Sequence, residues 1–140
     1  MVHALEESWR VLVPGGYLVD TRPLSGDMRV EVVADSRAKF AGLVDDSAWV
    51  ADDEATERAL ETVIRRGLFL KEEEARFTFF DYWDTLEQLR AYAREKWEGT
   101  HLPRTVWHKA EDLISQSEGN TRIRISVTML FCRYRKLNTL

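Results

Sequence analysis

A proline followed by two glycines separates a helical pattern from a strand-like pattern near the start of the chain. The apolar residues before this break recur at helical spacing and form one stripe: Val2, Leu5, Trp9 and Leu12. Pro14 ends the helix, because it has no N–H to donate and its ring clashes with the preceding turn. Gly15 and Gly16 then permit a tight turn, and residues 17–19 leave it as an apolar strand that ends over residues 20–23. The segment therefore predicts a helix, a sharp stop and a buried strand.

The composition is that of an ordinary globular domain. Hydrophobic residues make up 44% and charged residues 31% of the 140 positions, so we expect one domain over residues 1–140. The net charge of −4 disfavours a nucleic-acid-binding protein, which is more often basic. Cys132 is the only cysteine; this rules out an intramolecular disulfide and a cysteine-rich zinc site, and it fits a reducing cytoplasm. No apolar run approaches the ~20 residues of a membrane span. We therefore expect a cytoplasmic protein that binds neither nucleic acid nor a membrane.

A hairpin is expected directly after the first strand. Residues 28–34 alternate valines with polar side chains, as a strand does, and Asp35–Ser36 provides a turn. Residues 39–44 would return as the second strand, although a short helix from Ser36 is the alternative. We therefore assign residues 24–50 to a hairpin or loop insertion.

Five acidic residues follow within a short span: Asp45, Asp46, Asp52, Asp53 and Glu54. They favour a solvated loop and the start of a helix, where carboxylates meet unpaired N–H groups, over a metal site. Apolar residues between Ala55 and Ile64 predict that helix, and residues 65–67 predict its end.

The second half of the chain predicts a strand, two helices and a final strand. Residues 76–83 carry aromatic side chains at both odd and even positions, which predicts a strand covered on both faces. Asp84 and Glu87 match a capping box at a helix start, and Pro103 suits the first turn of a second helix. Residues 122–134 predict a long final strand, in which apolar side chains at the odd positions from Ile123 to Phe131 alternate with Arg122, Arg124, Ser126, Thr128 and Leu130.

Residues 10–16, Arg-Val-Leu-Val-Pro-Gly-Gly, resemble a segment of the class I S-adenosylmethionine-dependent methyltransferases, in particular the methyltransferase type 11-like group. In that family a helix ending in this motif runs into the fifth strand, and the last strand lies antiparallel between the fifth and the sixth. The order of elements here is similar: strand, insertion, strand, helices and final strand. The resemblance implies an α/β fold, or α+β as a fragment. It would be the C-terminal half of a Rossmann-like sheet with an inserted hairpin and flanking helices.

The same resemblance implies part of a methyltransferase that acts on a small-molecule acceptor. The family builds its cofactor site earlier, from a Gly-rich loop and an acidic residue, but the seven glycines here form no G-x-G-x-x-G stretch. S-adenosylmethionine is therefore the implied cofactor, while no cofactor-binding residue is expected in this chain. We expect the chain to supply the substrate-side half and to be inactive in isolation.

Candidate site residues are few. His108 is a candidate general base, because histidine titrates near neutral pH; a surface or capping histidine is the plainer interpretation. Arg22, at the end of the first strand, could hold an anionic substrate group or form a structural salt bridge. Four aromatic residues are numerous enough to line a pocket or to pack in the core: Tyr82, Trp83, Trp97 and Trp107. Of these, Tyr82 and Trp107 are the substrate-binding candidates. No H-E-x-x-H or similar spacing is present, so no metal is expected.

The alternative is a non-catalytic structural or interaction module derived from a methyltransferase. Without the family's fourth strand, the edge near residues 17–21 would stay unpaired, and an open strand edge invites pairing with another chain. We expect a homodimer across this edge or across an apolar helix face. Basic side chains on the final strand would then lie in solvent or at a dimer rim rather than bind phosphate: Arg122, Arg124, Arg133, Arg135 and Lys136.

Overall fold

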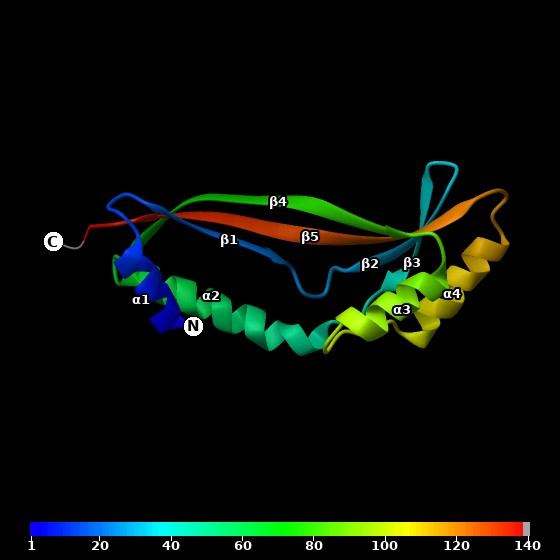
Figure 1. Ribbon diagram of the computed structural model, residues 1–140, viewed down its shortest axis with the longest axis horizontal. Coiled ribbons are helices and arrows are strands. Elements are labelled where there is room, and N and C mark those ends of the chain that lie inside the picture. Colours follow the sequence, from blue (N-terminus) through cyan, green and yellow to red (C-terminus); the bar gives the residue numbers. More distant parts are fainter. Residues whose placement is uncertain (139–140) are drawn as a thin grey trace. The chain divides into compact units, whose positions relative to one another are not determined.

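The computed structural model describes residues 1–138 and shows an α+β fold (Figure 1). The helices are α1 (Val2–Val11), α2 (Val50–Arg65), α3 (Leu86–Lys96) and α4 (Arg104–Ser115), with a short 3-10 helix over Ser47–Trp49. The strands are β1 (Tyr17–Pro23), β2 (Arg29–Ala34), β3 (Arg37–Leu43), β4 (Phe69–Trp83) and β5 (Thr121–Lys136). They form one sheet in the order β1-β5-β2-β3, and β4 pairs with β5 as well.

The expected Rossmann-like sheet is wrong, because the sheet is antiparallel throughout. β5 runs antiparallel to both β1 and β2, and β2 and β3 form an antiparallel hairpin. β1 and β2 pair with successive parts of β5 and run in the same direction along it, joined by residues 24–28. A parallel pair needs a crossover of a dozen or more residues, whereas β2 returns into β3 through Asp35 and Ser36 alone. One feature implied by the resemblance is present: β5 lies between β1 and β4.

The described residues form two compact units. The first contains Met1–Pro23, Ala51–Phe77 and residues 129–138, and the second contains Leu24–Val50 and Thr78–Thr128. Both β4 and β5 contribute one end to each unit. Each unit therefore has its own core, built from a different part of the same two strands.

The first unit packs helix α2 against β5. In Figure 1, α1 and α2 lie on the same side of β1 and of the adjoining part of β5. Its buried apolar residues come from α2, from the start of β4 and from β5: Ala59, Leu60, Val63, Phe69, Leu130, Cys132 and Tyr134. Trp9 of α1 donates its Nε1 hydrogen to the carbonyl of Leu137 at 2.9 Å. The predicted order of helix, stop and strand over residues 2–23 is confirmed. The expected burial of the strand is wrong, because exposed and half-buried residues alternate along β1 and none is buried.

The second unit packs α3 and α4 on the hairpin and on β5. Its core is largely aliphatic: Val30, Val32, Val44, Leu86, Leu89, Val106, Ala110, Leu113, Ile123, Ile125 and Val127. The predicted hairpin is confirmed, with Asp35 and Ser36 both at positive φ in the turn. A Cβ at Gly42 of β3 would lie 2.5 Å from Cγ2 of Val106, so α4 contacts the bare backbone of this strand.

The buried apolar side chains of β5 are at odd-numbered positions in the second unit and at even-numbered positions in the first. In the second unit the odd positions Ile123, Ile125 and Val127 are buried. In the first unit the even positions Leu130, Cys132 and Tyr134 are buried instead, whereas Met129 and Phe131 are only half-buried. Each half of β5 therefore serves a different core.

Strand β4 is longer and much more exposed than expected. It begins at Phe69, and residues 70–80 are all exposed. Phe77, Phe79 and Phe80 are 47%, 53% and 44% exposed, so the prediction of a strand covered on both faces is wrong. Within the described residues β4 pairs only with β5, so it is an edge strand, and both of its faces are exposed over residues 70–80.

Helix α3 begins one residue later than the predicted capping box. Thr85, not Asp84, is the N-cap, and its side chain accepts a hydrogen bond from the backbone N–H of Gln88 at 3.1 Å. Gln88 Oε1 in turn accepts from the N–H of Asp84 at 3.0 Å. The helix therefore begins with a capping arrangement of the predicted kind, with Thr85 and Gln88 in place of Asp84 and Glu87. None of the helices within residues 1–138 is both long and apolar enough to cross a membrane.

Candidate functional site

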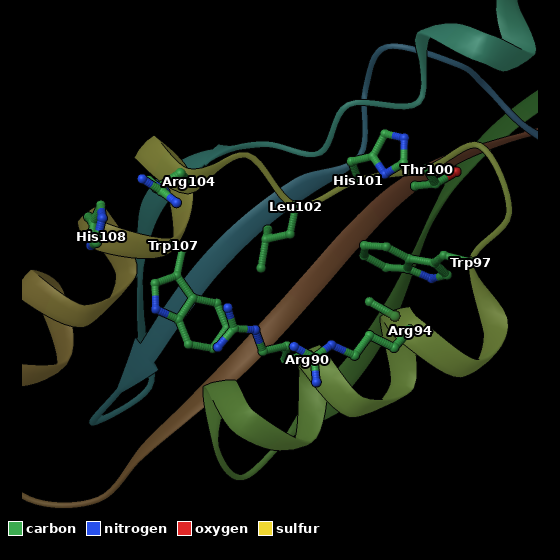
Figure 2. A pocket seen from close by; sticks show the side chains of 10 residues that line it. Arg90, Arg94, Trp97, Thr100, His101, Leu102, Arg104, Trp107 and His108 are labelled. Atoms are coloured by element: carbon green, nitrogen blue, oxygen red, sulfur yellow. The ribbon is translucent and has the colours of Figure 1, made fainter.

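The candidate site is a pocket in the second unit, between α3 and α4 (Figure 2). It has a volume of about 720 Å³, which is within the usual range for small-molecule sites. Its lining combines arginines, histidines and indoles: Arg90, Ala93, Arg94, Trp97, Thr100, His101, Leu102, Arg104, Trp107 and His108. No carboxylate is part of this lining, so the pocket is cationic although the chain carries a net charge of −4.

Helical spacing brings the lining residues to two facing walls. Arg90, Arg94 and Trp97 follow one another at intervals of four and three residues along α3 and its C-cap, so they share one face. At the start of α4, Trp107 and His108 lie three and four residues after Arg104, so each is a neighbour of Arg104 on the helix surface. The loop between the helices adds Leu102, which lies between the two indoles in Figure 2.

The loop that closes the pocket is fixed to the hairpin side of the unit. His101 and Asp45 exchange two backbone hydrogen bonds of 2.8 Å. The indole Nε1 of Trp49 lies 3.1 Å from both the carbonyl oxygen of Glu98 and Oγ1 of Thr100. The pocket wall therefore rests on fixed backbone rather than on a free loop.

The guanidinium groups of the pocket lack acidic partners. None of Arg90, Arg94 and Arg104 forms an ion pair with a carboxylate of residues 1–138 within 4.0 Å. Arg90 instead stacks on the ring of Trp107, at 4.8 Å from the ring centroid. Unpaired guanidinium groups beside apolar rings are the arrangement that binds planar anions.

Glu111, one turn along α4, orients two of the lining side chains. Its Oε2 lies 3.1 Å from Nδ1 of His108, and its Oε1 accepts a hydrogen bond from Nε1 of Trp107 at 2.7 Å. The hydrogen bond with His108, followed by the one with Trp107, lowers the pKa of the Glu111 carboxyl. An ionised Glu111 therefore holds both rings from outside the pocket.

The structure brings together two of the four candidate residues. Trp107 and His108 both line the pocket. Tyr82 lies elsewhere in the second unit, on β4, where the guanidinium of Arg122 stacks on its ring at 4.5 Å. Arg22 belongs to the first unit and forms ion pairs with Asp20 and with Glu57 of α2. Arg22 therefore forms the structural salt bridge that was the alternative to substrate binding.

Sequence reasoning missed the three arginines of the pocket. Their signal is the pairing of arginine with tryptophan at helical spacing, Arg90-x-x-x-Arg94-x-x-Trp97 and Arg104-x-x-Trp107. On a single helix, the same pattern is expected of a solvent-exposed face that carries arginines and one tryptophan. Only the packing of α3 beside α4 gives the two stripes a common pocket.

The basic side chains of β5 are engaged within the chain. Arg124 and Arg133 stack on the rings of Phe80 and Tyr17, and Lys136 lies over Trp9. Carboxylates of the same unit pair with four of the arginines: Arg122 with Asp84, Arg124 with Glu31, Arg133 with Glu72 and Glu73, and Arg135 with Glu72. The basic side chains of β5 therefore have partners within their own units.

No group of three or more potential metal-ligating side chains occurs within residues 1–138. Comparison of the chain with protein-family models, with curated proteins and with solved structures found no match. The site is therefore interpreted from its own chemistry.

Proposed function

We propose that this chain supplies the substrate-side part of an S-adenosylmethionine-dependent methyltransferase in the cytoplasm, with the pocket between α3 and α4 as the site for a small-molecule acceptor. The observation that carries the proposal is the pocket itself, which is lined by two indoles and three unpaired arginines. The motif of residues 10–16 before β1 supports the family, and so does the antiparallel β5 between β1 and β4. The cofactor is held by residues outside this chain, because its 140 residues contain no Gly-rich phosphate- or nucleotide-binding loop.

On this proposal the chain positions the acceptor and leaves activation of the methyl group to the cofactor. In-line methyl transfer from a sulfonium depends mainly on placing the two reacting atoms in contact and in line. His108 stands at the pocket wall, where it could accept the proton that some acceptors release. On this proposal the isolated chain binds the acceptor but has no methyltransferase activity.

The test is native purification through the chain followed by an activity assay. The material purified from source cells with an antibody against residues 1–138 is assayed for transfer of a labelled methyl group from S-adenosylmethionine to a panel of small acceptors. We expect transfer, together with a polypeptide that carries a Gly-rich strand–loop–helix, either fused to this chain or bound to it. Recombinant 1–140 should bind neither S-adenosylmethionine nor S-adenosylhomocysteine more tightly than about 100 µM. Purified native material without any methyl transfer contradicts the proposal.

A second candidate function is a non-catalytic interaction module that forms a homodimer. The edge of β1 opposite β5 is unpaired among the described residues, and Tyr17 and Val19 on this strand are 50% and 51% exposed. Such an edge is a template for a strand from a second copy. Sedimentation at micromolar concentration should show a dimer that Val19→Lys dissociates. A monomer at that concentration rules out this alternative.

A further inference from the structure

The two indoles define the shape of the ligand. Trp97 and Trp107 are half-buried and come from opposite walls, with Leu102 between them. Indole faces stack favourably on other planar rings, although Arg90 covers one face of Trp107. Leu102 and Ala93 add apolar contacts to the lining. A flat aromatic ring system therefore fits this part of the pocket better than a flexible polar chain.

The arginines define the charge of the ligand. Arg90, Arg94 and Arg104 surround the rings from both helices and are exposed to solvent. A guanidinium presents a rigid fork of N–H donors that matches the two oxygens of a carboxylate or phosphate. Glu111 is bonded to Trp107 and His108 and also interacts electrostatically with Arg90. Arg94 and Arg104 form no ion pair with a carboxylate of residues 1–138, so their positive charge is available to a ligand.

The start of α4 adds to this preference for anions. Pro103 is its N-cap and provides no side-chain hydrogen bond to the first turn. The first N–H groups of a helix have no intrahelical partner and carry the positive end of the helix dipole. Arg104, the first helical residue, lines the pocket. A cationic ligand would be repelled from such a wall, and a neutral one would leave the arginines without a partner.

We infer that the acceptor bound between α3 and α4 is an aromatic oxyanion, a planar ring that carries a carboxylate or phosphate group. This inference rests on the proposed function for its role as methyl acceptor, but the binding site is defined without it. The ring lies against Trp97 and Trp107, and the oxyanion is held by the arginines.

The experiment is calorimetric titration of the full 1–140 chain with 2-naphthoate as probe. Its matched probes are 2-naphthamide, which keeps the ring without the charge, cyclohexanecarboxylate, which keeps the charge without the aromatic ring, and 2-naphthyl phosphate. We expect 2-naphthoate or 2-naphthyl phosphate to bind at least about tenfold more tightly than the neutral and the non-aromatic probes, and the stronger of the two identifies the oxyanion. Equal affinity for the amide and the acids overturns the inference, and so does the absence of binding by both acids.

Variants assign the binding to this pocket. Arg94→Gln and Arg104→Gln each remove one unpaired guanidinium and should weaken binding of the preferred acid by about tenfold or more, the loss of one charge-assisted contact. Lys109→Gln on α4 removes the same charge outside the pocket lining and should leave the affinity within about twofold. Equal effects of all three substitutions would place the ligand elsewhere and contradict the inference. Binding of the acid with these effects but no methyl transfer by native material would sink the proposed function alone, whereas methyl transfer without binding of either acid would sink only the inferred acceptor class.

Discussion

Each of the two units contains a charged cluster on its sheet, and the two clusters differ in whether they contain buried polar atoms without a hydrogen-bond partner. In the second unit, Glu31 accepts hydrogen bonds from Nε of Arg124 at 2.7 Å and from Oγ of Ser126 at 2.9 Å. In the first unit, Nε of Arg22 lies 3.6 Å from Oδ2 of Asp20. Within residues 1–138, this Asp20 oxygen and both Nε and Nη1 of Arg22 are buried without a hydrogen-bond partner.

The difference shows which cluster stabilises its unit. A buried polar atom without a partner destabilises the folded state by about 1–3 kcal/mol. Among the described residues, the Glu31–Arg124 cluster contains no such atom. The Asp20–Arg22 pair contains three: one on Asp20 and two on Arg22. We therefore expect the Glu31–Arg124 pair to be needed for stability and the Asp20–Arg22 pair to be replaceable by apolar side chains.

The largest expected effect is the loss of the countercharge in the second unit. Arg124→Met leaves Glu31, which is 9% exposed, without its hydrogen-bonded cation, and we expect the free energy of unfolding to fall by about 3 kcal/mol. Urea denaturation monitored by tryptophan fluorescence measures this. Arg122→Met is the matched control: Arg122 is half-exposed and pairs with the exposed Asp84, so its loss should be below about 1 kcal/mol. Equal losses for both variants would remove the special role of Glu31.

The contact between α4 and the hairpin should give the next largest effect. Gly42→Ala places a Cβ against Val106 at a φ of +153°, and we expect a loss of about 2 kcal/mol from overpacking. Val106→Ala removes the clashing methyl groups, so the double variant should be more stable than the sum of the two single losses predicts. Strict additivity in this cycle, again by urea denaturation, would show that the two residues do not touch.

Replacement of the under-bonded pair tests the other side of the comparison. Asp20→Leu combined with Arg22→Met should leave the free energy of unfolding unchanged or raise it by up to about 1 kcal/mol, because both orphaned groups are removed together. Arg22→Met alone should be destabilising, because it leaves Asp20 without a cation. A double variant less stable than this single variant would show that the pair is worth more than its geometry indicates.

The smallest expected effect is on the pH dependence of stability. Burial of Glu31 opposes its ionisation, but the hydrogen bonds from Arg124 and Ser126 outweigh it and lower the pKa of this carboxyl below 4.5. A carboxyl with a lowered pKa in the folded state stabilises the protein above its unfolded pKa, and this stabilisation is lost as the pH falls through the folded pKa. Glu31→Gln should therefore flatten the fall in stability between about pH 5 and about pH 3. A slope identical to that of the unaltered chain would rule out this linkage.

The parts of the fold predicted from the sequence are those set by local chemistry. Pro14 to Gly16 determined the end of α1 and the start of β1, and the turn at Asp35 and Ser36 determined the hairpin. The missed features depend on distant partners. The run Lys71 to Glu74 is too charged to predict a strand, yet Glu72 pairs with Arg133 and Arg135 across the sheet.

The candidate site was predicted only in part for the same reason. Trp107 and His108 are chemically conspicuous in the sequence, and both line the pocket. Arg90 and Arg94 look like an ordinary solvated helix face until α4 is placed beside them. The buried apolar side chains of β5 also change from odd to even positions at Leu130, where the strand passes from one core to the other. A periodicity rule for a single strand does not predict such a change.

The most direct test of the pocket is a nitrogen-edited spectrum of the tryptophan indoles during titration with 2-naphthoate or 2-naphthyl phosphate. The chain has five tryptophans, so each indole N–H gives a separate probe. We expect the resonances of Trp97 and Trp107 to move with the same saturation curve, while those of Trp9 and Trp83, outside the pocket lining, stay in place. Movement of Trp9 or Trp83 without Trp97 and Trp107, or no movement at all, would contradict a binding site between α3 and α4.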